Sequence, residues 1–253
     1  MKRILLALVC TTLSLCAVAQ TQVIAHRGFH ATKNSFDNTI SSLKHAQELG
    51  VYGSEVDINE TQDGVLIAIH GARHRDIADV QKADFAAIRA LPLRNGETVP
   101  TFEEYLEQAK RSKTTKLIIE VKSHATPEQE TRVVKNILAG VKKHKLTKRV
   151  EYIAFSKHVC DELVKLAPKK TQIAYLNGEL TPAQCKAAGY TGIDYNINTM
   201  KRHPEWIKQS HDLGLTVNVW TVNDTANLQW CIDQGVDYIT TDNPLEANRL
   251  LGK

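Results

Sequence analysis

The sequence of 253 residues lacks several features that would assign it to a common class of protein. It contains no dense run of basic residues, and 32 lysines and arginines against 28 aspartates and glutamates leave a net charge of only +4. A nucleic-acid partner is therefore not expected. It also shows no internal repeat of fixed period and no sign of a second domain. The composition, 42% hydrophobic and 24% charged, is that of an ordinary globular chain with one sizeable core.

Cysteine is scarce as well, and its spacing excludes a zinc motif of the usual kind. Beyond the N-terminal segment the sequence holds only Cys160, Cys185 and Cys231. An odd number permits one disulfide with a free thiol, or no disulfide at all. We interpret these three residues as small, buried hydrophobic side chains.

The N-terminal segment predicts a secretory signal peptide over residues 1–19. Met1-Lys2-Arg3 is basic, residues 4–18 are mostly apolar, and Ala17-Val18-Ala19 has the pattern of a cleavage site. The segment is too short for a membrane-spanning helix, so stable membrane insertion is not expected. A buried N-terminal helix is the alternative. Cleavage before Gln20 would yield a secreted protein, with the periplasm as its expected location.

After residue 20, short apolar segments alternate with amphipathic ones to the end of the chain. Strands are expected at 22–26, 52–58, 65–70, 116–121, 150–155, 172–176, 192–196, 215–221 and 236–240. Helices are expected at 38–49, 101–111, 127–144, 157–167, 181–188, 203–213, 224–233 and 244–251. This alternation indicates a parallel sheet, and the length suits a single TIM (β/α)8 barrel over 20–253. A doubly wound open sheet is the alternative, although it usually has a glycine-rich loop where Gly28 stands alone.

One stretch departs from the alternation. Only twelve residues separate Asp57 from His70, and they include the turn signal Asp63-Gly64. That is the lower limit for a parallel crossover and leaves no room for a full helix. We expect the barrel to be irregular between its second and third strands. Residues 71–100 then form an excursion, with a short helix near 83–90, that should overhang the site.

Charged residues at strand ends indicate a functional site. Glu55 and Asp57 end one predicted strand, and Glu120 and Lys122 end another, each pair at i, i+2 and so on one face. Burying such charges is costly unless they are paired or bind a metal. Ordinary solvated strand ends are the alternative for either pair alone.

Two histidines strengthen this interpretation. His26 and His70 each end a short apolar strand and are followed closely by glycine. A single histidine at a strand end is more often structural or exposed. In a parallel barrel, however, the carboxyl ends of all strands converge on one face, where active sites form. We therefore expect the two histidines and the three carboxylates to lie together.

The order and combination of these motifs resemble the glycerophosphodiester phosphodiesterases over essentially the whole chain after residue 20. The motifs are His26-Arg27-Gly28, Asp37-Asn38-Thr39, Glu55-Val56-Asp57, Thr61-Gln62-Asp63-Gly64 with His70, Glu120-Val121-Lys122, Val219-Trp220-Thr221-Val222-Asn223 and Tyr238-Ile239-Thr240-Thr241-Asp242-Asn243-Pro244. The resemblance implies catalytic histidines at His26 and His70. It also implies metal ligands at Glu55, Asp57 and Glu120.

The chemistry of these residue types agrees with hydrolysis of a phosphodiester. Carboxylate oxygens suit one divalent cation, Ca²⁺ or Mg²⁺. Arg27 has the forked geometry for phosphate oxygens, and Lys122 could add a point charge. Histidines serve as general acid and base, although the sequence does not say which does which. Trp220 either packs against the glycerol or headgroup, or belongs to the barrel core.

The chain also departs from the family pattern. Asp37 stands where glutamate is usual, so its contact with the site is open. Gly71 stands where aspartate usually follows the second histidine, and the Arg-Thr-Thr that usually comes next is absent, although Arg73 and Arg75 are nearby. These changes suggest a non-standard leaving group or headgroup.

The expected function is that of a secreted, metal-dependent phosphodiesterase. Its partner would be a small glycerophosphodiester, cleaved to sn-glycerol 3-phosphate and an alcohol. The resemblance leaves open whether the glycerol's own hydroxyl acts first, through a cyclic phosphate. Alternatives are a phospholipase-like activity on intact lipid or another headgroup, and a barrel that binds a phosphodiester without cleaving it. The sequence leaves the oligomeric state open.

The remaining scattered histidines are expected at the surface: His30, His45, His124, His144, His158, His203 and His211.

Overall fold

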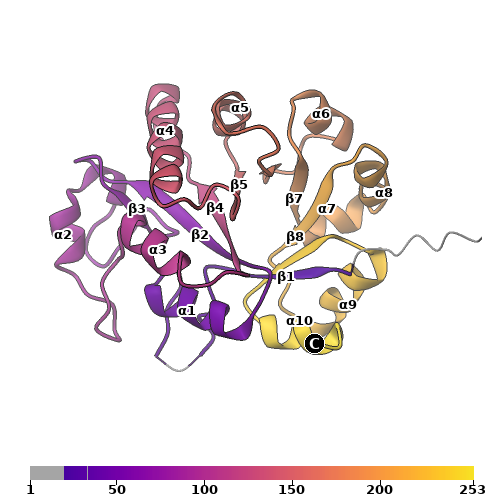
Figure 1. Ribbon diagram of the computed structural model, residues 1–253, viewed down its shortest axis with the longest axis horizontal. Coiled ribbons are helices and arrows are strands. Elements are labelled where there is room, and N and C mark those ends of the chain that lie inside the picture. The colour runs from indigo at the N-terminus through magenta and orange to yellow at the C-terminus, as the bar shows by residue number, and fades with distance from the viewer. Residues whose placement is uncertain (1–19, 33) are drawn as a thin grey trace, which may run out of the picture.

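The computed structural model describes residues 20–32 and 34–253, so the predicted signal peptide lies outside the described residues. Eight parallel strands form a closed barrel, confirming the predicted TIM fold (Figure 1). Closure comes from pairing between the first two strands, Ile24 with Gly53 and Ala25 with Ser54. In barrel order the strands are β1 (Gln22–Ala25), β2 (Gly53–Glu60), β4 (Lys116–Val121), β5 (Val150–Ala154), β6 (Ile173–Tyr175), β7 (Gly192–Asn196), β8 (Thr216–Trp220) and β9 (Tyr238–Thr241).

Helices surround the strands as a ring (Figure 1). They are α1 (Ile40–Leu49), α3 (Phe102–Ala109), α4 (Pro127–Lys143), α5 (Lys157–Leu166), α6 (Pro182–Ala187), α7 (Ile197–Arg202), α8 (Glu205–Asp212), α9 (Thr225–Gln234) and α10 (Pro244–Leu250). Capping explains several of their starts, since Thr126 and Thr181 each form a capping box ahead of a proline. The sequence did not predict α7, which follows β7 without a break because the Asn196 side chain caps it.

The strand predicted at 65–70 is real but is not a barrel strand. β3 (Leu66–Ala68) runs antiparallel to β2, pairing Ala68 with Ile58 and Leu66 with Glu60. The turn at Asp63-Gly64 therefore closes a hairpin, and no crossover helix is needed. The expectation that His70 ends a parallel barrel strand is wrong. The chain reaches the same end of the barrel by folding back from the projecting tip of β2.

The excursion after β3 forms a small unit with its own core. It contains a 3₁₀ turn η1 (Val80–Lys82) and α2 (Phe85–Arg89), close to the predicted short helix. This unit projects from one side of the barrel (Figure 1). Its buried apolar residues form a cluster separate from the main core: Ile67, Val80, Ile88 and Val99.

Two apolar layers stabilise the barrel. The larger lies between the strands and the helix ring, and it includes Cys160, Cys185 and Cys231, each 0% exposed. These cysteines are free thiols in the described part of the chain, as expected for small core residues. The smaller layer fills the barrel interior with Ile24, Ile118, Ile153 and Leu176. Among the described residues, no helix is long and apolar enough to cross a membrane.

Candidate active site

A pocket of about 430 Å³ opens at the carboxyl ends of the barrel strands. It brings together residues that are far apart in the sequence and that come from different strands. The sequence-predicted His26, Arg27, Glu55, His70, Glu120 and Trp220 all line it, together with Ile153, Phe155, Leu176, Asp194, Thr221 and Thr240.

A tight turn after β1 shapes one side of the pocket. Arg27 and Gly28 both adopt left-handed backbone conformations, with φ of 54° and 80°. A Cβ on Gly28 would lie 2.4 Å from the Ser42 hydroxyl oxygen, so only glycine fits there. The turn directs the Arg27 backbone N–H at Glu55 Oε2, 2.7 Å away. The His-Arg-Gly motif thus positions a carboxylate as well as two side chains.

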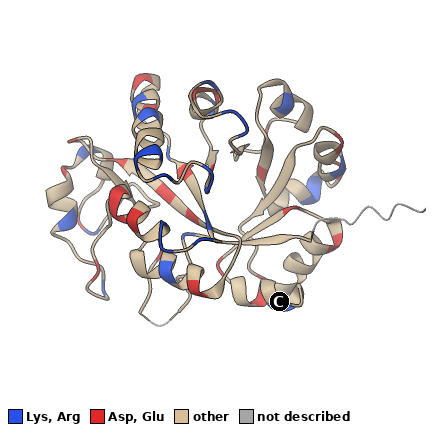
Figure 2. Cartoon of the chain, viewed as in Figure 1, with Lys and Arg blue, Asp and Glu red and all other residues tan. Residues whose placement is uncertain are grey.

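Glu55, Asp57 and Glu120 form a possible metal site. Their carboxylates offer oxygens within 4.8 Å of one another, and the three residues are at most 8% exposed. Asp57 and Glu120 are paired neighbours on β2 and β4. Figure 2 shows acidic bands on β2 within the barrel, whereas most other charged residues lie on the surrounding helices and loops.

The electrostatics of this cluster favour a bound cation. Burial, followed by the charges of Asp57 and Glu120, raises the pKa of Glu55. Burial and the charge of Asp57 also raise the pKa of Glu120, to about 7. Within the described chain, Glu55 Oε1 is buried without a hydrogen-bond partner. An all-oxygen donor set with an orphaned carboxylate oxygen fits a hard divalent cation.

Two polar neighbours hold the metal-site carboxylates in place. Lys122 Nζ donates to Glu120 Oε1 at 2.6 Å and to Asp57 Oδ1 at 3.2 Å. Asn38 donates to Asp57 Oδ2 at 2.7 Å and accepts from the Asp57 backbone N–H at 3.0 Å. Burial raises the pKa of Asp57, but Lys122, His70 and the Asn38 hydrogen bond lower it by more. The contact expected between Lys122 and phosphate stays a prediction.

Arg27 links this cluster to Asp37, one of the departures from the family pattern. Arg27 Nη1 lies 3.5 Å from Asp37 Oδ2, and Arg27 Nε lies 3.5 Å from Asp57 Oδ2. The shorter side chain at position 37 therefore still reaches the arginine. The Arg27 side chain is 23% exposed and lines the pocket, so the ion pair leaves it accessible to a ligand.

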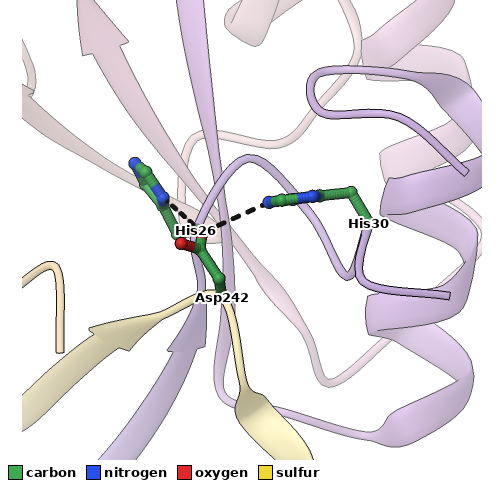
Figure 3. A group of neighbouring side chains, drawn as sticks. All are labelled: His26, His30 and Asp242. Carbon is green, nitrogen blue, oxygen red and sulfur yellow. Dashed lines mark hydrogen bonds and ion pairs between the residues drawn. The ribbon is translucent and has the colours of Figure 1, made fainter. Parts of the chain in front are cut away.

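His26 belongs to a cluster that the sequence did not reveal (Figure 3). Its Nδ1 lies 2.7 Å from Asp242 Oδ1, and His30 Nε2 lies 3.2 Å from the same oxygen. Burial raises the pKa of Asp242, but the hydrogen bonds from His26 and His30 lower it well below the usual range. An ionised carboxylate only accepts, so His26 Nδ1 donates and its Nε2 is left free.

His70 lines the same pocket and follows the β2–β3 hairpin. The hairpin places it near Asp57, whose charge opposes the effect of partial burial, which lowers the pKa of His70. His70 also lines a second hollow of about 560 Å³. Residues from the excursion and the loop before α1 complete this hollow: Asp37, Asn38, Gly71, Arg73, His74, Leu93 and Val99.

Trp220 belongs to the barrel interior and also lines the pocket, while its contact with the glycerol or headgroup stays a prediction. Its indole lines the pocket and packs against the interior layer of the barrel. Its Nε1 donates to the Asp194 carbonyl at 2.8 Å, and its ring meets Phe155 edge-on with centroids 5.5 Å apart. The tryptophan thus forms a rigid apolar wall opposite the carboxylates.

Sequence reasoning missed Asp242 and placed at the surface several histidines that are not exposed. Of the seven expected there, His211 is exposed, His144 is buried and the other five are partly buried. His30 is partly buried against Asp242, and His144 is buried beside Glu103, 3.0 Å from its Oε1. Asp242 could have been found, because it lies two and four residues beyond Thr240 and Tyr238, which share the interior face of β9. The i, i+2 rule that identified Glu55 and Asp57 applies equally there.

The fold and the site define a TIM barrel with an acidic candidate metal site and two histidines in one pocket. The chain belongs to the glycerophosphoryl diester phosphodiesterase family, which residues 26–246 match. A curated glycerophosphodiester phosphodiesterase from Caldanaerobacter subterraneus subsp. tengcongensis is 29% identical over 251 residues, covering 92% of this chain and 99% of the relative.

Solved structures agree with this assignment. A glycerophosphodiester phosphodiesterase from Parabacteroides distasonis superposes with a TM-score of 0.90 at 43% identity, covering 92% of this chain and 98% of that one. A phosphodiesterase from Oleispira antarctica, in complex with the product sn-glycerol-3-phosphate, shares the fold with a TM-score of 0.82 at 18% identity. That match covers 92% of this chain and 98% of the other.

Proposed function

We propose that this protein is a metal-dependent phosphodiesterase that cleaves glycerophosphodiesters to sn-glycerol 3-phosphate and an alcohol. One observation carries the proposal: a single pocket is lined by Glu55, Glu120 and both predicted catalytic histidines. Asp57 lies behind it, with its carboxylate within 4.8 Å of those of Glu55 and Glu120. Membership of the glycerophosphoryl diester phosphodiesterase family supports it. So do the relatives, which are named for this activity.

Glu55, Asp57 and Glu120 would hold one divalent cation, Ca²⁺ or Mg²⁺. When bound, the cation would neutralise phosphoryl oxygens and so favour the charge that develops during the displacement. Arg27 supports the same anion with a guanidinium that is already oriented by Asp57 and Asp37. Lys122 holds the Glu120 and Asp57 carboxylates in position through its two ion pairs and adds positive charge nearby.

His26 and His70 would share the proton transfers. Asp242 fixes the tautomer of His26 whose Nε2 can accept a proton, which suits a general base. His70 lines both the pocket and the second hollow, and this position supports a role as the acid that protonates the leaving alcohol. The alcohol would then leave through the hollow formed by the excursion, where the chain departs from the family pattern.

A small, soluble substrate is favoured over an intact lipid. Among the described residues, the exposed large hydrophobic side chains are Val164, Leu166, Leu213 and Leu245. All four lie on or beside helices α5, α8 and α10, and none belongs to residues 71–100 at the pocket. An enzyme that works on a membrane would be expected to present apolar side chains around its opening.

The test is release of sn-glycerol 3-phosphate from glycerophosphocholine, glycerophosphoethanolamine and glycerophosphoinositol. The purified protein is stripped of metal and assayed with Ca²⁺, with Mg²⁺ and with neither. His70→Ala should abolish turnover while the fold persists. His211→Ala is the matched control, since His211 lies in the last turn of α8, at the opposite end of the barrel. Metal-independent release, or full activity in His70→Ala, would contradict the proposed mechanism. Tight binding of these diesters without cleavage would favour a non-catalytic barrel.

We further propose that residues 1–19 direct secretion to the periplasm and that residues 20–253 form the single mature domain. Support comes from the order of basic, apolar and small residues in the segment. N-terminal sequencing of the protein from a cell fraction tests this. A mature N-terminus at Gln20 in the periplasmic fraction is expected, and an intact Met1 in the cytoplasm would contradict it.

A further inference from the structure

Asp194 on β7 is a buried acid that the mechanism above does not use. The residue is 1% exposed, and within residues 20–32 and 34–253 its Oδ1 has no hydrogen-bond partner. No ion pair to it is found in that part of the chain either. An unsatisfied buried carboxyl oxygen is costly, so such a group usually serves a ligand or a trapped water.

The surroundings of Asp194 suit a neutral carboxyl group. Burial raises its pKa to about 8, and the charges of Glu120 and Glu151 act in the same direction. A hydrogen bond from Asn218, its paired neighbour on β8, lowers the pKa of Asp194 but does not cancel the rise. A protonated carboxyl both donates and accepts hydrogen bonds, as a hydroxyl group does.

The position of Asp194 is the second observation. It lines the active-site pocket and also a smaller cavity, of about 310 Å³, in the barrel interior. On one side of the pocket lie the carboxylates Glu55 and Glu120. The other side is apolar, formed by Phe155, Leu176 and Trp220. Trp220 is fixed against the Asp194 carbonyl by its indole N–H.

This arrangement matches a short carbon chain with an anion at one end and hydroxyls along it. We propose that Asp194 hydrogen-bonds a hydroxyl of the glycerol half of the substrate, and that it selects glycerol phosphates over phosphates of simple alcohols. The inference rests on the proposed function. It adds the residue that distinguishes a polyol from an alkyl group, because a partner hydroxyl satisfies Asp194 and a methyl group leaves it unpaired.

Binding of two small phosphates, which involves no turnover, tests the inference. sn-Glycerol 3-phosphate and n-propyl phosphate carry the same anion and differ in their two hydroxyls. Their dissociation constants are measured by calorimetry at pH 7 with the same divalent cation. The wild-type protein should prefer the glycerol phosphate by about tenfold, as expected for one hydrogen bond. Asp194→Leu should lose that preference, and Asp194→Asn should keep most of it.

The preference between the two ligands is the decisive quantity, because a purely structural role would weaken both equally. Circular dichroism confirms that each variant is folded, and Asp194→Asn keeps the test valid if the leucine variant fails to fold. An unchanged preference in Asp194→Leu would overturn the inference and leave the carboxyl to a water in the small cavity. The inference would also be overturned if Asp194→Leu and Asp194→Asn both lost the preference for glycerol phosphate over propyl phosphate. Cleavage of glycerophosphodiesters by a wild-type protein without this preference would overturn the inference alone. Failure of the wild type to bind or cleave would overturn the proposed function as well.

Discussion

Replacing Glu120 by glutamine should stabilise the metal-free protein at high pH. Glu120 ionises in the fold with a pKa of about 7, against an ordinary value of 4.5. The folded state therefore binds more protons than the unfolded state between these values, and stability falls as pH rises through this window. A gap of 2.5 units corresponds to about 3 kcal/mol. That pKa already reflects the opposing ion pair with Lys122. Glutamine stays neutral and avoids the cost.

Thermal unfolding with a chelator present measures this effect. Above pH 7, Glu120→Gln should melt on the order of 10 °C higher than the wild type, and the two should converge near pH 4.5. Glu48→Gln, at a 59%-exposed carboxylate on α1, is the matched control and should follow the wild type throughout. Added Ca²⁺ should reverse the order, because the wild type keeps all three carboxylates. Parallel curves for Glu120→Gln and wild type across this pH range would refute the reasoning.

Three further changes test the supports of the site. Asp242→Asn should lower kcat by about 10²-fold or more with little change in KM, because His26 loses its fixed tautomer; steady-state kinetics would show a KM effect instead if Asp242 bound substrate. Asn38→Ala should weaken cation affinity about 10–100-fold, measured by calorimetry, since Asp57 loses two hydrogen bonds; unchanged affinity would contradict this support. Gly28→Ala should destabilise the protein by about 2 kcal/mol or more in urea unfolding, because a Cβ there meets helix α1; a neutral result would contradict the close approach.

The sequence predicted the barrel and the acidic strand ends because both depend on local pattern. Alternating apolar segments and capped helices gave the element order, and the i, i+2 rule placed Glu55 with Asp57. The antiparallel course of β3 was not predicted, since a twelve-residue gap permits either a hairpin or the shortest crossover. That choice depends on pairing between Ile58 and Ala68, which no local pattern reveals.

The contacts of His26 could not be predicted from the sequence for a different reason. Asp242 is 216 residues away along the chain, and only closure of the barrel brings β9 beside β1. His30 was assigned to the surface because its loop has no periodicity to indicate a face. Asp194 looked like any polar residue in a short strand, because the surrounding strands decide that its Oδ1 has no hydrogen-bond partner among the described residues.

Because β2 and β3 form a hairpin, the residues that close the barrel are separate from those that line the second hollow. In a regular barrel the same strands and loops would serve both purposes. Beyond Ile58, the tip of β2 pairs with β3 in the described structure and contributes nothing to barrel closure. His70 therefore belongs to a module with its own small core, which also lines the second hollow, where we propose that the alcohol leaves. Insertions or deletions in residues 71–100 would reshape that hollow without changing the stagger of the eight barrel strands. Leaving-group preference is thus free to diverge, or to be engineered by loop exchange, while the phosphate chemistry stays fixed.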